Sequence, residues 1–252
     1  MPRSERTIRV EAVVLRHSDW GEADRLITLY SRENGKLRSI AKGARRLKSR
    51  KAGHLEPFTR VALLLARGRD LWIITQAETV DPFLSLGNDL IRTANASYVL
   101  ELLDRFTYDE GENRALYDLL IETLQRLDNG ADIFLTIRYY EMRLLDLMGF
   151  RPELFRCVEC VKEIQPEDQF FSAMQGGILC PSCGTRAAGT QLVSMQALKY
   201  MRHIQRSNYV EILRATPVMG VRNEMESLMQ AYMSFILERG LNSPGFLREI
   251  SN

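Results

Sequence analysis

The sequence predicts a multi-domain α+β protein, in which a small N-terminal β-barrel precedes an α-helical domain with an inserted cysteine-rich module. Apolar residues recur with a period of two up to about residue 80 and with a period of three to four after it, as in strands followed by helices. All four cysteines lie inside the helical part. We expect the first domain at 1–80 and the second at 81–252, interrupted at about 151–188 by the cysteine-rich module.

Five short strands are expected in the first domain. The first is indicated by Ile8, Val10, Ala12 and Val14, which alternate with Arg9, Glu11 and Val13. The other strand-like runs cover 24–31, 36–43, 58–68 and 70–80, with turns at Arg-Glu-Asn-Gly (32–35) and at 68–70. No long helix separates these strands. Five strands in about 75 residues fit a closed OB-type barrel.

Helical patterns follow from residue 90. Apolar rows with a spacing of three or four residues occur at 90–106, 116–127, 133–148, 194–205, 208–214 and 221–239. Asn129-Gly130 and Gly149 end the second and third of these helices, and Ser194 is suited to cap the fourth. Because each helix has an apolar face to bury, we expect the helices to pack against one another.

The cysteines form two Cys-x-x-Cys pairs, at 157–160 and 180–183, with nineteen residues between the pairs. This spacing is typical of tetrahedral zinc sites, because each pair lets two thiolates converge on one ion. Four cysteine ligands would leave no coordination position for water or substrate. We therefore expect one structural zinc ion held by Cys157, Cys160, Cys180 and Cys183. The alternative is structural thiols or two disulfides, which a cytosolic chain rarely keeps.

Positive charge is concentrated in the first third of the chain. Residues 1–80 contain seventeen Lys and Arg against nine Asp and Glu, so their net charge is +8, while the remainder carries −6. Seven of these cations precede the first acid, Glu56, within residues 38–58: Arg38, Lys42, Arg45, Arg46, Lys48, Arg50 and Lys51. A charge distribution of this kind attracts polyanions to one end of a protein.

This run of cations has two interpretations. It is either a solvated loop or a site for the phosphates of a nucleic acid. Seven like charges repel one another unless an anion is bound, and the small residues Gly43 and Gly53 let the backbone approach a ligand closely. OB-type barrels also bind single strands through their loops. We favour phosphate binding by the seven cations. Bases could then stack on aromatic residues of the barrel, although a position in the core is an equal alternative for each of them: Trp20, Tyr30, Phe58 and Trp72.

Two parts of the sequence are similar to the RecO family of bacterial recombination mediators. Residues 20–58, WGEADRLITLYSRENGKLRSIAKGARRLKSRKAGHLEPF, resemble its N-terminal domain in their Gly-Glu-x-Asp-Arg turn, Lys-Gly-Ala-Arg-Arg run and Leu-Glu-Pro-Phe. MGFRPELFRCVEC (148–160) and GGILCPSC (176–183) resemble its zinc-bearing C-terminal part. The resemblance implies an OB-fold domain, a helical domain and a zinc ribbon.

The resemblance also implies a function in DNA repair and recombination without catalytic turnover. Members of the family bind single- and double-stranded DNA, anneal complementary strands and, with RecR and sometimes RecF, help load RecA onto DNA coated by single-stranded-DNA-binding protein, whose tail they also bind. Carried over to this sequence, metal binding falls on the four cysteines. DNA binding falls on Lys42, Arg45, Arg46, Lys48, Arg50 and Lys51.

No catalytic constellation is recognisable in the sequence, so we expect a protein that is not an enzyme. Its three histidines form no metal motif, and no phosphate-binding glycine loop is present. A nuclease would need a carboxylate cluster that the acid-poor first third lacks. The remaining alternative is a zinc-ribbon RNA- or DNA-binding factor of transcription or translation. Without a signal peptide or an apolar run of membrane-spanning length, we expect a cytoplasmic, nucleoid-associated protein with no membrane partner.

Overall fold

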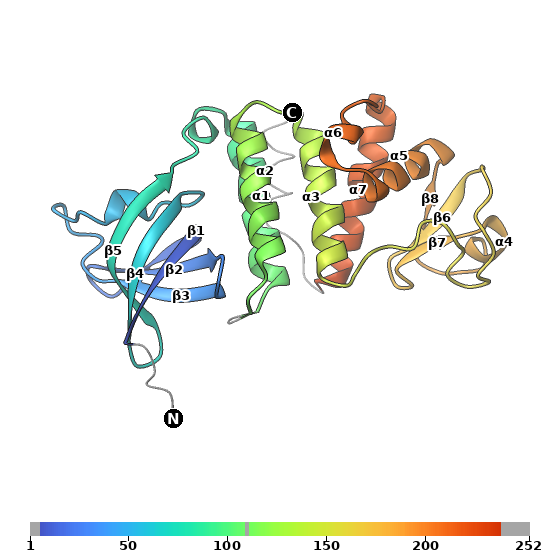
Figure 1. The fold of residues 1–252 in the computed structure, drawn as a ribbon. Coiled ribbons are helices and arrows are strands. Elements are labelled where there is room, and N and C mark those ends of the chain that lie inside the picture. The colour runs from blue at the N-terminus through green and yellow to red at the C-terminus, as the bar shows by residue number, and fades with distance from the viewer. Residues whose placement is uncertain (1–5, 109–110, 238–252) are drawn as a thin grey trace. The chain divides into compact units, whose positions relative to one another are not determined.

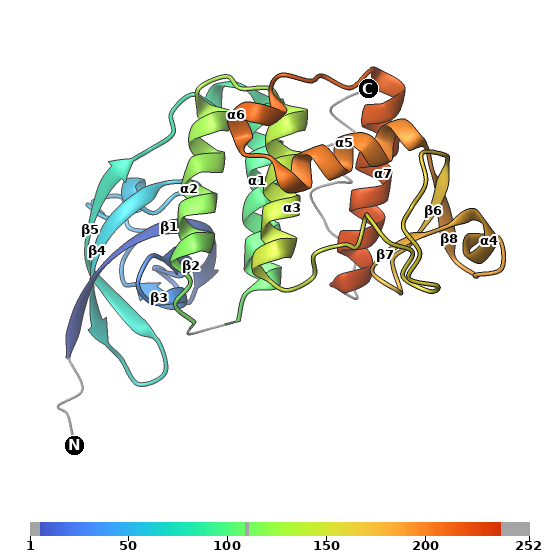
Figure 2. The same ribbon diagram turned by 45° about the vertical axis from the view of Figure 1, so that its right-hand side comes forward.

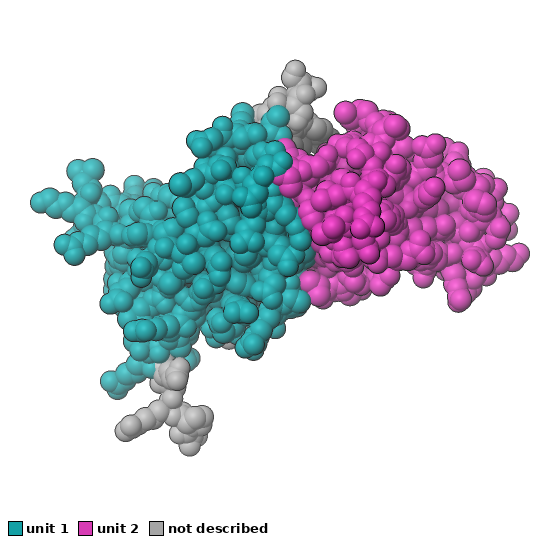
Figure 3. All heavy atoms as spheres, turned by 45° about the horizontal axis from the view of Figure 1, so that its top comes forward, with its two compact units in different colours: residues 1–130, 249–252 teal, residues 131–248 magenta. Residues whose placement is uncertain are grey.

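The structure is a computed structural model that describes residues 6–108 and 111–237 of the 252-residue chain. Its described residues form two compact units (Figure 3). The first unit runs to Gly130 and the second begins at Ala131. Each unit is described separately.

The first unit begins with a closed five-stranded barrel (Figure 1). The order around it is β1-β2-β3-β5-β4, in which all neighbours are antiparallel except β3 and β5. This arrangement confirms the expected OB-like barrel. The strands are β1 (Thr7–Trp20), β2 (Asp24–Ser31), β3 (Gly35–Ala41), β4 (Arg60–Arg67) and β5 (Trp72–Asp81).

Successive residues of each strand point alternately into the barrel and out of it, and some residues on both faces are buried. Val14, Ile27 and Leu65 belong to a continuous core inside the barrel, as period-two patterning predicts. Outward-facing residues of β1 and β2, such as Val13 and Tyr30, are buried as well. α1 (Leu90–Phe106) packs against β1, and α2 (Arg114–Asp128) bonds to β1 through Tyr117, so these helices cover part of the outer face of the barrel.

Polar contacts hold α1 and α2 to the barrel. The Lys36 ammonium pairs with Asp104 at 2.6 Å and donates to the Asp104 carbonyl, near the C-terminal end of α1. Arg16 pairs with the same carboxylate at 2.9 Å. On α2, the Tyr117 hydroxyl donates to Glu11 Oε1 at 2.9 Å, and Glu11 also accepts from Arg60. The barrel ends with β5 at Asp81, close to the expected boundary at residue 80. The first compact unit continues beyond it and includes two of the expected helices.

The second unit combines helices with a small three-stranded sheet of order β7-β6-β8 (Figure 2). The core of the helical part lies between α3, α5 and α7, which contact one another and whose buried residues include Leu144, Met201 and Met229. None of the described helices in either unit is long and apolar enough to cross a membrane. The elements are α3 (Ile133–Leu147), β6 (Gln169–Ser172), β7 (Gly177–Leu179), α4 (Pro181–Gly184), β8 (Thr190–Val193), α5 (Met195–Arg206), α6 (Tyr209–Ile212) and α7 (Met219–Ile236).

Candidate functional site

The predicted cations lie on β3 and on the loop that follows it, residues 42–51, named here the basic loop. Its backbone has a defined shape. Gly43, at φ +66, donates its N–H to Asp24 Oδ1 at 2.8 Å, and the Arg45 N–H donates to the Ala23 carbonyl at 3.0 Å. A turn is closed by the Ser49 N–H, which donates to the Arg46 carbonyl at 2.9 Å. The barrel therefore fixes the loop through backbone hydrogen bonds and through Ala44, which is buried in the barrel core.

Two of the seven predicted cations support the fold. The Arg45 guanidinium donates to the carbonyls of Gly21 and Glu22, both at 3.2 Å, and pairs with Asp19 at 3.1 Å. The Lys51 ammonium donates to the Ile74 carbonyl on β5 at 2.9 Å. Burial lowers the pKa of Lys51. Both side chains anchor the loop, a role that their charge alone does not reveal.

The other five cations are exposed and form no side-chain hydrogen bond or ion pair with any residue that the structure describes: Arg38, Lys42, Arg46, Lys48 and Arg50. The first acid after them, Glu56, binds Arg25 at 2.8 Å and His17 at 3.0 Å instead. Burial would raise the pKa of Glu56, but the bonds from Arg25 and His17 outweigh it and lower that pKa. No ion pair with a described residue therefore offsets the positive field of these five cations.

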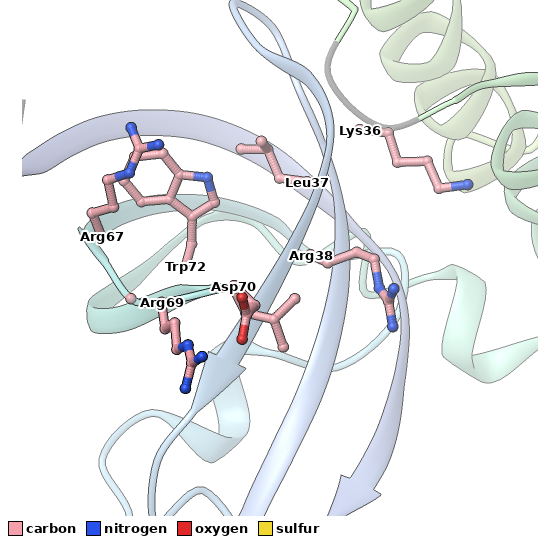
Figure 4. Close-up of a pocket in the computed structure, with 9 residues that line it drawn as sticks. Lys36, Leu37, Arg38, Arg67, Arg69, Asp70 and Trp72 are labelled. Carbon is pink, nitrogen blue, oxygen red and sulfur yellow. The ribbon is translucent and has the colours of Figure 1, made fainter. Parts of the chain in front are cut away.

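A shallow cavity of about 200 Å³ extends this cationic surface between β3 and the β4–β5 hairpin (Figure 4). Arg38, Arg69, Asp70 and Trp72 are among the residues that line it, whereas the Lys36 ammonium turns toward α1. Gly68 is needed in the hairpin because a Cβ there would lie 2.3 Å from the Leu71 carbonyl oxygen. The sequence patterns did not predict this cavity, because β3 and the hairpin meet only when the barrel closes through the parallel pair β3–β5.

The barrel aromatics divide into core and surface residues. Tyr30 is 1% exposed and cannot stack on a base from solution. Trp20, at the end of β1, is 49% exposed. Trp72 and Phe58 are half-buried, and Phe58 has the unusual φ of 72°. Trp20 and Trp72 are therefore the aromatic residues best placed to meet a base beside the basic loop or the cavity.

The four cysteines converge in the second unit, as their spacing predicts. Their Sγ atoms all lie within 4.8 Å of one another, and the Sγ atoms of Cys160 and Cys180 are 3.8 Å apart. Zn–S bonds of about 2.3 Å at tetrahedral angles place sulfur atoms about 3.8 Å apart. The cluster therefore fits a tetrahedral metal ion: Cys157, Cys160, Cys180 and Cys183.

The local fold brings the two pairs together. The first pair lies in a tight turn, in which the Val161 N–H donates to the Cys157 carbonyl at 2.8 Å with Val161 at φ 62. The Val158 N–H donates to the Ile178 carbonyl at 2.9 Å, which joins this turn to β7 and so to the second pair. Cys180 precedes the short α4, whose first residue is Pro181. Sequence spacing alone predicted this cluster because its four cysteines lie within one short segment of the chain.

The electrostatics of the cluster favour a bound cation. Burial raises the pKa of Cys157, but backbone N–H donors from Cys160, Cys180 and Glu159 outweigh it and lower that pKa to about 6. Burial and the neighbouring thiols raise the pKa of Cys183 to about 12. A second thiolate beside that of Cys157 would meet like-charge repulsion, which a divalent metal ion would offset.

Comparisons with known proteins match both the N-terminal and the C-terminal part of the chain. The family model described as "Recombination protein O N terminal" matches residues 5–83, and "Recombination protein O C terminal" matches residues 87–244. The DNA repair protein RecO of Roseiflexus sp. (strain RS-1) is 43% identical, over 98% of this chain and 87% of the relative. Those of Dehalococcoides mccartyi (strain CBDB1) and Pelotomaculum thermopropionicum are 35% and 36% identical, over 92% and 95% of this chain and 91% and 93% of theirs. The chain belongs to the RecO family of DNA repair and recombination proteins.

Proposed function

We propose that the protein binds single- and double-stranded DNA through its barrel and acts in repair by annealing complementary strands. The observation that carries this proposal is the set of five exposed cations on β3 and the basic loop that have no partner among the described residues. A sugar-phosphate chain supplies the negative charges that these cations lack. The cavity at Arg38, Arg69 and Trp72 offers a second contact for the same strand.

Annealing follows from contacts to phosphates rather than to base edges. Two strands repel each other through their phosphates, and cations bound along one of them reduce that repulsion. Phosphate contacts carry no sequence information, so the base edges stay free to pair. The protein would therefore speed the pairing of any complementary strands. Annealing makes and breaks no covalent bond, and we propose that the protein is not an enzyme.

We further propose that the protein works in the cytoplasm, at the nucleoid, within a larger assembly. With RecR, and sometimes RecF, it would help load RecA onto DNA coated by single-stranded-DNA-binding protein, whose tail it would also contact. Family membership supports these partners. The basic loop would bind the DNA, and the other parts of the chain would bind the proteins.

For the four-cysteine cluster we propose one structural zinc ion. Four thiolate ligands complete a tetrahedral shell and leave no open position for a reacting water. A bound ion would cross-link the 157–160 turn to the start of α4, and it would have no catalytic role. Metal content measured by atomic spectroscopy, expected at one zinc per chain, tests this assignment.

Binding of a labelled single strand at increasing salt tests the proposed DNA contact. Five phosphate contacts with a slope of about −0.7 each lower the affinity by roughly a hundredfold between 50 and 200 mM salt. Affinity that is independent of salt, or absent, would overturn the proposal.

A matched pair of variants locates the contact. The double variant Arg46→Glu with Lys48→Glu reverses two exposed cations of the basic loop, and we expect it to abolish annealing with an unchanged melting temperature. The control, Lys199→Glu with Arg214→Glu, reverses two exposed cations of the second unit and changes the net charge equally. Equal effects of both pairs on annealing would show that only net charge matters. Strands of unchanged length after the reaction would separate annealing from nuclease activity.

A further inference from the structure

The tip of the basic loop carries an apolar side chain that folding does not use. Leu47 has a relative exposure of 107%, so it is as accessible as in an extended chain. Single exposed apolar residues are common on protein surfaces and need no explanation by themselves. Leu47 differs in its position, because it lies between Arg46 and Lys48, two exposed cations without a partner among the described residues.

The loop holds this tip in a fixed place. On one side of Leu47, Arg45 is bound to the carbonyls of Gly21 and Glu22. On the other side, the Ser49 N–H closes a turn onto the Arg46 carbonyl at 2.9 Å, which spans Leu47 itself. The turn projects the leucine into solvent. A phosphate chain that reaches the flanking cations is thereby brought next to an apolar group of fixed position.

We propose that Leu47 acts as a wedge that enters between two neighbouring bases of the bound DNA strand and separates them. Apolar side chains, leucine among them, insert between stacked bases in other DNA-binding proteins, where nearby cations hold the phosphates. Here Arg46 and Lys48 would hold the phosphates on either side of the opened step. The proposal rests on the proposed function, since it requires the strand to lie on the basic loop.

This wedge would give the annealing activity a specific property. A strand folded back on itself must lose its internal stacking before it pairs with a complement. A side chain that unstacks one step would open such strands at the protein surface. Unstructured strands would gain much less from it. Leu47 would thus determine which strands are annealed rather than whether DNA is bound.

The direct test uses a single strand that contains 2-aminopurine, whose fluorescence rises when the base is unstacked. We expect the wild-type protein to raise this fluorescence on binding and Leu47→Ala to lose the rise. The salt slope of binding should stay the same in Leu47→Ala, because no cation is removed. Leu84→Ala is the control, since Leu84 is an exposed leucine (72%) outside the basic loop. It should behave as the wild type.

A second measurement compares annealing of hairpin-forming strands with annealing of unstructured strands. Leu47→Ala should slow the first reaction several-fold and leave the second nearly unchanged. If the wild type binds with the expected salt slope but gives no fluorescence rise, or if Leu47→Ala equals the wild type, the wedge is overturned while DNA binding stands. If the wild type shows no salt-dependent binding, both proposals fail together.

Discussion

The basic loop and the four-cysteine cluster are both short, irregular parts of the chain, yet they are held in opposite ways. The loop is fixed by the Gly43 N–H, which donates to Asp24, and by the Arg45 and Lys51 side chains, which donate to barrel carbonyls, while its other cations are exposed. In the cluster the four cysteine sulfur atoms lie within 4.8 Å of one another and so converge on a common centre. A charged segment whose backbone is bonded to the barrel leaves its remaining cations available to a ligand, whereas we expect a segment whose thiols converge on one centre to need an ion to fold.

The largest effect that would test this comparison is removal of the metal. Chelation, or Cys157→Ser, should unfold residues 157–183, because structural zinc contributes about 10 kcal/mol or more to folding in small zinc modules. Hydrogen exchange should show that amides of this segment lose their protection, while amides of the barrel stay as protected as in the metal-bound protein. Salt-dependent DNA binding by the basic loop should survive. A ribbon that stays protected without metal would contradict the comparison.

The next effect separates the anchoring cations from the exposed ones. Arg45→Ala removes two hydrogen bonds to carbonyls and one ion pair, and should lower the free energy of unfolding by about 1–2 kcal/mol. Arg46→Ala should leave stability within about 0.5 kcal/mol, because an exposed side chain without a partner contributes little. Denaturant unfolding measures both. The DNA-binding salt slope should fall by about 0.7 for Arg46→Ala.

A smaller effect decides whether the cationic surface continues into the cavity. Arg69→Ala should weaken single-strand binding by several-fold, about 1 kcal/mol, if a phosphate reaches the β4–β5 hairpin. Titrations at two salt concentrations would show the lost contact as a lower slope. The exposed Arg214 of the second unit is the matched control, and Arg214→Ala should change neither value. An unchanged Arg69→Ala would confine the interface to the basic loop.

The smallest effect concerns acid. The pKa of Glu56 is lowered because its bonds to Arg25 and His17 outweigh burial, so its contribution to stability is complete above the ordinary value of 4.5 and is lost as the pH falls through the lower folded value. The carboxylate is half exposed, which limits the contribution to less than about 1 kcal/mol. Melting temperatures between pH 6 and pH 3 should fall less steeply for Glu56→Gln than for the wild type. Parallel curves would contradict this assignment.

Period and spacing were sufficient to predict the barrel and the convergence of the four cysteines. Alternation between Ile8 and Val14 identified β1, although the strand extends to Trp20 beyond an irregularity between Val14 and Arg16. The six apolar rows correspond to α1, α2, α3, α5, α6 and α7, with small shifts at the ends; residues 238–239 of the last expected helix lie outside the described residues. These features depend on neighbours in the chain. The four-residue α4 was not expected, because it is too short to show a period.

The roles of individual cations could not be predicted in the same way. Lys51 and Arg50 are adjacent in sequence and carry the same charge, but Lys51 reaches the Ile74 carbonyl and Arg50 is exposed. That distinction depends on β5, which lies more than twenty residues further along the chain. The cavity is a similar case, since it forms only where β3 and β5 pair. Which of the seven predicted cations bind DNA stays a prediction for the variants above.

The position of Trp20 has a practical consequence. The chain contains two tryptophans, Trp20 at the end of β1, beside the turn that Arg45 binds, and Trp72 in the wall of the cavity. No other part of the chain contributes indole emission. Tryptophan fluorescence, excited at a wavelength that tyrosine does not absorb, is therefore a label-free optical signal from the cationic side of the barrel, and the second unit, which has no tryptophan, is silent in it.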